Sequence, residues 1–217
     1  MSVQNPPPTA GRRAILGHLP DAANLLTLTG LASSIVAITF ALNAEYEAAA
    51  IGLLLAFFFD VIDGPVAKRL HGRTAYDGAF GANLDSLADM VTAGVALGVV
   101  LLSYGEFGIV YVPGALALTT AAAMRLSYFN VHGLDEASAS YTGLPTDLVT
   151  ITFAAVMLLD APLPRDAFQP LLYGAAVALA ALLVSPLPIP KLTGRWYYAL
   201  IALAVLIAAA HAARLVV

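Results

Sequence analysis

The chain has no cysteine, and only 11% of its 217 residues are charged. The lack of cysteine excludes disulfides, thiolate catalysis and zinc–thiolate sites. There is also no basic run suited to binding nucleic acid, and a formal net charge of −4 says little about partners. In contrast, 60% of the residues are hydrophobic and the mean hydropathy is +0.83. A soluble domain of this size cannot bury so much apolar surface, so the lipid bilayer is the expected solvent.

Seven apolar stretches are expected to span the membrane. They cover about residues 22–42, 47–70, 81–104, 108–131, 143–160, 167–185 and 196–215, and the fifth is the shortest. We expect residues 21–217 to form one all-α, polytopic transmembrane helical bundle, with a six-helix core and an extra C-terminal span. Residues 1–20 are expected to be a disordered tail followed by a short amphipathic helix, Gly11–Leu19, that lies in the membrane interface.

The positions of lysine and arginine predict an orientation. With the N-terminus inside, eight of them lie on the cytoplasmic side and only Arg165 and Arg214 lie outside. The loop after Leu70 is then cytoplasmic, and seven spans place the C-terminus outside. We expect a multi-pass protein of the cell membrane whose polar site faces the cytoplasm.

Four acids lie within the second and third expected spans: Asp60, Asp63, Asp85 and Asp89. A charge inside the bilayer costs several kcal/mol, so four of them need compensation. Lys68 and Arg69 lie at the edge of the second span and can offset only part of this charge. A proton path or a purely structural cluster is the simpler interpretation, and a metal site is the more specific one.

Spacing places the acids on two helix faces. One face carries Asp60, Asp63, Gly64 and Ala67, and the next helix carries Gly81, Asp85 and Asp89. A short hairpin joins the two helices, so we expect them to pack antiparallel with the acidic faces opposed. Carboxylates without nearby Cys or His select hard cations such as Mg²⁺, Mn²⁺ or Ca²⁺. Four carboxylates can hold two ions, which is what chemistry on a pyrophosphate would use.

The segments DVIDGPVAKRL and GANLDSLAD resemble the signature of the CDP-alcohol phosphatidyltransferase family, D-x-x-D-G-x-x-A-R followed by G-x-x-x-D-x-x-x-D. Seven of its eight fixed residues match. The family arginine is replaced by Lys68, with Arg69 next to it, and lysine cannot form a bidentate fork on phosphate. The connection is also about four residues longer than usual, and we expect the extra residues in a loop, His71–Gly78, where insertion is cheap.

The resemblance implies a role for each matching residue. Asp60, Asp63 and Asp85 would bind metal, and Asp89 would bind metal and accept the proton of the attacking alcohol. Gly64 and Ala67 would line the nucleotide pocket, and Lys68 would reach toward phosphate. Gly81 also has no side chain, which leaves room for a ligand beside the acids. The alcohol attacks the phosphorus that bears the lipid, and CMP leaves. The cofactors would be two divalent ions, Mg²⁺ or Mn²⁺, and a homodimer is expected.

Residues 22–192 resemble, more weakly, the bacterial and archaeal phosphatidylserine synthase branch of the family. The similar segments are AANLLTLTGLASSIVAITFALN, LDSLADMVTAGVA, MRLSYFN with YTGLP, and LLVSPLPIPK. TGLPTDL departs from that pattern, because a second proline and small residues are expected after the first proline. The resemblance favours CDP-diacylglycerol and L-serine as substrates. The alternatives are inositol phosphate, glycerol phosphate or choline as acceptor, an intramembrane prenyltransferase, and an ion transporter.

Four residues outside the signature are further candidates for substrate contact: Asn24, Thr27, Arg125 and Asn130. Arg125 could bind the carboxylate of serine or the lipid phosphate. It could instead form a salt bridge with Asp147 or extend to the interface. Asn130 could support the same pocket. Asn24 and Thr27 lie on one side of the first span and could contact the nucleotide, although a threonine in a membrane helix often bonds its own backbone.

Overall fold

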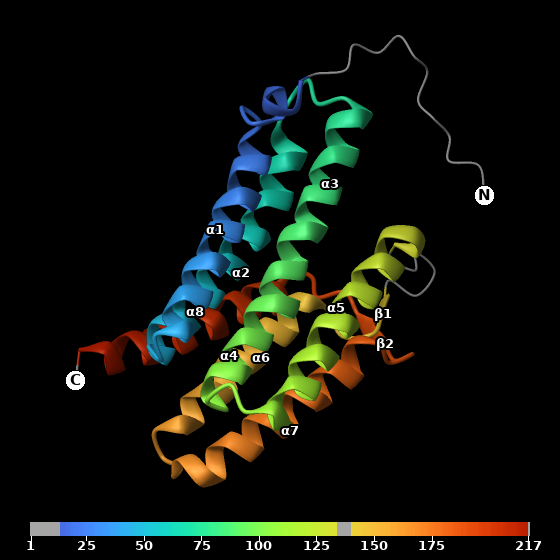
Figure 1. The fold of residues 1–217 in the computed structure, drawn as a ribbon. Helices are drawn as coiled ribbons and strands as arrows, with labels where there is room; N and C mark the ends of the chain where they lie inside the picture. Colours follow the sequence, from blue (N-terminus) through green and yellow to red (C-terminus); the bar gives the residue numbers. More distant parts are fainter. Residues whose placement is uncertain (1–13, 134–139, 217) are drawn as a thin grey trace.

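The structure is a computed structural model that describes residues 14–133 and 140–216. Within them the chain is nearly all helical (Figure 1). The helices are α1 (Ala22–Leu42), α2 (Tyr46–Arg69), α3 (Ala75–Asp89), α4 (Leu97–Tyr104), α5 (Val112–His132), α6 (Thr146–Met157), α7 (Arg165–Leu183) and α8 (Arg195–Leu215). A π-helical segment, Met90–Ala96, joins α3 to α4, so the two run as one long helix. There are 3-10 turns at Ile15–His18, Ile109–Tyr111 and Leu158–Asp160.

Each expected span contains a helix, which confirms the predicted all-α polytopic bundle. Six helices of the described residues are long and apolar enough to cross a membrane. The exception is α6, which has 12 residues and continues for three more as a 3-10 turn, whereas a full crossing takes about 20. It corresponds to the fifth span, which the sequence also predicts to be the shortest.

The third span begins earlier than the sequence predicts. Its helix starts at Ala75 rather than at residue 81, so the loop covers residues 70–74 and does not extend over His71–Gly78. The cause is a capping box, in which the Asp77 N–H donates to Thr74 Oγ1 at 3.2 Å and the Thr74 N–H donates to Asp77 Oδ2 at 3.0 Å. Much of the longer connection therefore extends α3 instead of forming a loop.

Helix α2 contains Pro65, two residues after Asp63. Proline has no N–H, so the carbonyl four residues earlier, that of Val61, loses its helical partner. The Tyr197 hydroxyl of α8 donates to this carbonyl at 3.0 Å. The bond attaches α8 to α2 beside the acidic residues.

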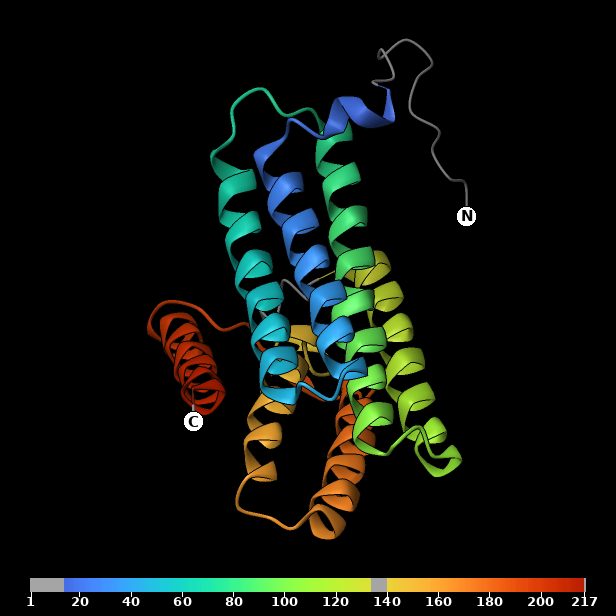
Figure 2. The same cartoon turned by 60° about the vertical axis from the view of Figure 1, so that its left-hand side comes forward.

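Helix α8 lies on the outside of the bundle. Figure 2 shows it to one side of the other helices. Its buried residues Ala204 and Ile207 pack with buried residues of α2 and α6, whereas Leu203 and Leu206 are exposed. An exposed apolar face of this kind suits contact with lipid.

Two short strands connect the loops around α6 and α7. β1 (Ser140–Thr142) pairs antiparallel with β2 (Pro188–Pro190), which the sequence does not predict. Gly143 follows β1 with a φ of +76°, and a Cβ there would lie 2.3 Å from the carbonyl oxygen of Leu183. Only glycine fits this conformation and this close approach. The start of α6 is thereby held against the end of α7.

The segment before α1 presents apolar side chains to its surroundings. Ile15 and Leu16 of the 3-10 turn are 83% and 72% exposed, which suits a membrane interface. Arg12 and Arg13 of the expected amphipathic helix lie outside the described residues. The division of the chain into residues 1–20 and 21–217 stays a prediction.

Candidate active site

Five carboxylates converge inside the bundle. In two groups of three, the ligand oxygens all lie within 4.8 Å of one another: Asp60 with Asp63 and Asp85, and Asp60 with Asp89 and Asp147. Asp60 belongs to both groups. The four aspartates that the sequence singles out therefore lie together, with two from α2 and two from α3, and α6 adds a fifth.

Asp147 was not predicted as a member of this site, and the sequence indicated it only as a possible partner of Arg125. Asp147 is the second residue of α6. It lies in TGLPTDL, where the chain departs from the expected pattern of a second proline and small residues. That departure was the available signal. The spacing of residues could not show that α6 begins beside α2 and α3.

Hydroxyl groups contact two of these acids. Thr27 Oγ1 donates to Asp63 Oδ2, and Thr146 Oγ1 donates to Asp89 Oδ2 at 2.8 Å. Among the described residues, none of the five carboxylates has a Lys, Arg or His nitrogen within 4.0 Å. Grouped buried charges are costly unless a cation balances them. A donor set made only of carboxylate and hydroxyl oxygens fits Mg²⁺, Mn²⁺ or Ca²⁺.

The π-helical segment begins directly after Asp89, at the end of the acidic face of α3. Such segments inside α-helices frequently mark functional sites. Here Thr92 of the segment makes a hydrogen bond of 2.7 Å with Ser34 of α1. Thr92 also lines the small cavity between the five acids, which has a volume of about 20 Å³. That space is sufficient for roughly one water-sized particle.

A larger cavity, of about 350 Å³, adjoins the acids. It brings together six of the residues that the sequence predicts to contact substrate: Asn24, Thr27, Gly64, Ala67, Lys68 and Gly81. Asp63 and Asp85 also line it, so it opens onto the acidic site. A Cβ added at Gly64 would meet no atom within 4 Å, so Gly64 borders open space. We refer to this space as the basic cavity, because Lys68 and Arg73 lie on its wall.

Thr27 and Asn24 belong to α1 and line this cavity. The Thr27 hydroxyl has two acceptors, Asp63 Oδ2 and the Ala23 carbonyl at 3.1 Å, so the alternative of a backbone bond is also present. Asn24 Nδ2 donates to the His18 carbonyl at 3.0 Å. Both side chains are nearly fully buried.

Arg125 is 7% exposed, and its Nε has no hydrogen-bond partner. The guanidinium carbon lies 5.1 Å from the ring centre of Phe129 and 6.0 Å from that of Tyr141. Burial raises the pKa of the Tyr141 hydroxyl, so that ring is neutral. Arg125 interacts electrostatically with Asp89 and Asp147, but the alternative of a direct salt bridge with Asp147 is not formed within the described residues. The guanidinium is therefore near the acids and free to bind an anion.

Arg125 also lines a second cavity of about 350 Å³, between α5 and the segment after α7. Asn130 does not line this second cavity. This residue lies at the exposed end of α5, where its Oδ1 accepts from Ser86 Oγ at 2.9 Å. It borders neither the acidic cavity nor the basic cavity, and its substrate role stays a prediction.

The fold and the site together define a class of protein. A polytopic helical bundle holds carboxylates that suit divalent ions, beside a cavity with basic side chains. Such an arrangement suits metal-assisted chemistry on a phosphate ester within a membrane.

The family follows from comparison with known proteins. Residues 21–187 match the family model described as CDP-alcohol phosphatidyltransferase. The chain belongs to the CDP-alcohol phosphatidyltransferase family.

Several curated relatives are similar to this chain. It is 33% identical over 141 residues to an archaetidylserine synthase of Methanothermobacter thermautotrophicus, which covers 64% of this chain and 58% of the relative. It is 28% identical over 139 residues to a CDP-diacylglycerol–serine O-phosphatidyltransferase of Helicobacter pylori (63% and 57%). It is 30% identical over 159 residues to one of Mycobacterium bovis (69% and 52%). The chain spans little more than half the length of these relatives.

Proposed function

We propose that this protein transfers a phosphatidyl group from CDP-diacylglycerol to the hydroxyl of L-serine and releases CMP. The convergence of five carboxylates beside the basic cavity, in a chain of this family, supports the chemistry. The names of the relatives specify serine, and this supports L-serine as the acceptor.

Two divalent ions, Mg²⁺ or Mn²⁺, fit the acids. Asp60, Asp63 and Asp85 would hold one ion, and Asp60, Asp89 and Asp147 the other. When bound, the ions would neutralise the diphosphate and orient the phosphorus that is attacked. Two such ions together with Arg125 would balance the charge of the five carboxylates, and this agrees with the lack of another cation in contact with them in the described part of the chain.

The protein's side chains then serve the transfer. The serine oxygen forms a bond to the lipid-bearing phosphorus, the bond from that phosphorus to CMP breaks, and the electron pair leaves with CMP. Asp89 takes the serine hydroxyl proton. Its Oδ2 is held by the Thr146 hydroxyl, which orients the carboxylate, and an oriented base contributes through geometry as much as through its pKa.

Arg125 would bind the carboxylate of serine. A buried guanidinium with an unpartnered Nε needs an anion, and a carboxylate matches its fork. The aromatic rings of Phe129 and Tyr141 hold the guanidinium plane in place. No other Lys or Arg lies in the described part of residues 126–160, which favours an acceptor without a phosphate of its own.

The site would open to the cytoplasm. The support is the excess of lysine and arginine on the side of the loop after α2. A homodimer, which the family resemblance implies, is part of the same proposal, and native mass spectrometry of the protein in detergent would test it.

The test is CMP release by the purified full-length protein. It would be supplied with CDP-diacylglycerol, Mg²⁺ or Mn²⁺, and one alcohol at a time: serine, inositol phosphate, glycerol phosphate or choline. We expect release with serine and almost none with the others. Ethanolamine, which lacks the carboxylate, is a matched control and should be a poor acceptor. If CMP appears only with another alcohol, the acceptor is wrong, and if it appears with none, the chemistry is wrong.

A further inference from the structure

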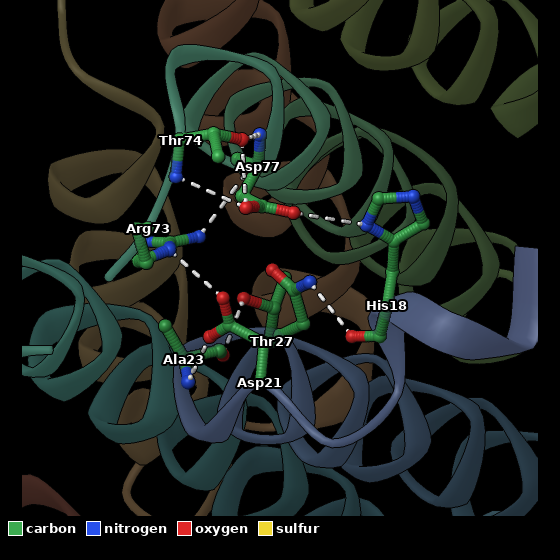
Figure 3. A network of polar contacts seen from close by, with 8 residues as sticks. His18, Asp21, Ala23, Thr27, Arg73, Thr74 and Asp77 are labelled. Atoms are coloured by element: carbon green, nitrogen blue, oxygen red, sulfur yellow. Dashed lines mark hydrogen bonds and ion pairs between the residues drawn. The ribbon is translucent and has the colours of Figure 1, made fainter. Parts of the chain in front are cut away.

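Arg73, in the loop between α2 and α3, is outside the positions of the family signature. Its guanidinium is held at two points (Figure 3). Arg73 Nε lies 2.8 Å from Asp21 Oδ2, the N-cap residue of α1, and Nη2 donates to the Asp77 backbone carbonyl at 3.3 Å. These contacts join the start of α1 and the start of α3, and they fix the direction of an otherwise flexible side chain.

The guanidinium points over Gly81. A Cβ built at Gly81 would lie 2.8 Å from Arg73 Nη2 and 3.2 Å from Asn24 Oδ1. The missing side chain of this signature glycine therefore leaves the space that Arg73 occupies. One turn further along α3 is Asp85, a member of the first acid group. Arg73 thus lies on the wall of the basic cavity, over the face of α3 that carries Gly81 and Asp85.

Phosphate binding in this cavity would also be served better by a guanidinium than by an ammonium group. Lys68 stands where the family signature has arginine, and its single ammonium cannot grip phosphate with two parallel bonds. Lys68 is exposed and Arg73 is half-buried, so the arginine is the better ordered of the two cations.

We propose that Arg73 binds the phosphate of the nucleotide that leaves as CMP, and so supplies the fork that Lys68 cannot. This inference rests on the proposed function, because the anion is the nucleotide of the CDP-lipid. Lys68 shares the charge as a point contact. The ion pair with Asp21 holds the guanidinium before substrate arrives, which lowers the cost of ordering it on binding.

The experiment compares two probes, CMP and cytidine, which differ only by the phosphate. Binding of each would be measured by calorimetry on the full-length protein in detergent with Mg²⁺. Arg73→Ala should weaken CMP binding about tenfold or more, the effect of losing a charge-assisted contact, and should leave cytidine binding unchanged. Arg73→Lys, which keeps the charge but not the fork, should fall between wild type and Arg73→Ala. Arg69→Ala is the matched control, because Arg69 is exposed and does not line the basic cavity.

The possible outcomes separate the two proposals. If wild type binds CMP and Arg73→Ala binds it equally well, the Arg73 inference is overturned and the proposed function stands. If Arg73→Ala weakens CMP and cytidine equally, its role is to shape the loop, which also overturns the inference. If wild type binds neither CMP nor CDP-diacylglycerol, the proposed function fails and takes this inference with it. Arg73→Lys covers the case in which Arg73→Ala does not fold, since equal CMP affinity in Arg73→Lys and wild type would exclude a fork.

Discussion

Helix α2 carries acidic residues toward both ends, and their surroundings differ. At its start, Glu47 is paired: His211 Nδ1 of α8 contacts its Oε2, and Arg214 Nη1 lies 3.4 Å from its Oε1. Toward its end, Asp60 and Asp63 lie among other carboxylates and have no such cation among the described residues. We call the start of α2, where Glu47 has cation partners, the paired end. We call the part that carries Asp60 and Asp63 the open end.

The difference separates an acid that stabilises the fold from acids that could bind a metal ion. His211 is 1% exposed and its Nε2 also contacts the Ala154 carbonyl at 3.0 Å, so the polar groups around Glu47 satisfy one another. The five aspartates instead contact hydroxyl groups and each other, and none of them has a cation in direct contact among the described residues. In a medium of low dielectric constant, grouped carboxylates are stabilised by bound cations or by taking up protons.

The largest expected effect is at Asp89, which we propose acts as the base. Asp89→Asn should lower the turnover rate by about 10² to 10⁴-fold, because a general base contributes about that much. CDP-diacylglycerol binding and the melting temperature should change little, since the amide still accepts from Thr146. Steady-state CMP release and lipid binding would both be measured. Turnover within a few-fold of wild type would remove Asp89 as the base.

The next largest effect concerns the fifth acid. Asp147→Asn should weaken the binding of one of two Mn²⁺ ions by about tenfold or more, because even residues outside the ligand shell alter metal affinity by about that factor. Electron paramagnetic resonance of Mn²⁺ bound to the protein would count the ions and report their affinities without any substrate. Asp160→Asn, at the other end of the same helical segment, is the control and should bind Mn²⁺ normally. Two sites of unchanged affinity in Asp147→Asn would show that Asp147 is no ligand.

A substitution at the paired end of α2 should lower stability and leave metal binding unchanged. His211→Ala should lower the free energy of unfolding by about 1–2 kcal/mol, because it leaves the Glu47 carboxylate and the Ala154 carbonyl short of partners. Mn²⁺ affinity should stay at the wild-type value, since the change lies far along α2 from the acids. Thermal unfolding in detergent and Mn²⁺ titration measure the two quantities. A loss of Mn²⁺ affinity without a loss of stability would break the distinction between the two ends.

The sequence predicts the helices and four of the five acids, because both depend on local information. A run of apolar residues sets a span, and a spacing of three or four residues sets a helix face. Asp147 and Arg73 could not be assigned in this way. Asp147 reaches the site because β1, β2 and Gly143 fix where α6 begins, and Arg73 reaches its cavity because Asp21 and the capping box of α3 hold the loop. Such contacts between distant segments are set by tertiary packing.

The smallest expected effect tests how α8 is attached near the open end of α2. Tyr197→Phe removes the hydroxyl that donates to the Val61 carbonyl, which Pro65 leaves without a helical partner. Hydrogen bonds between membrane helices contribute about 0.6 kcal/mol on average, so we expect a loss of about 0.6–1 kcal/mol in unfolding free energy. Tyr198→Phe is the matched control, because Tyr198 is 70% exposed and should lose nothing measurable. If the two variants unfold alike, the carbonyl is satisfied by another group. If Tyr197→Phe also lowers Mn²⁺ affinity, the contact between α8 and the Val61 carbonyl helps to shape the acidic site.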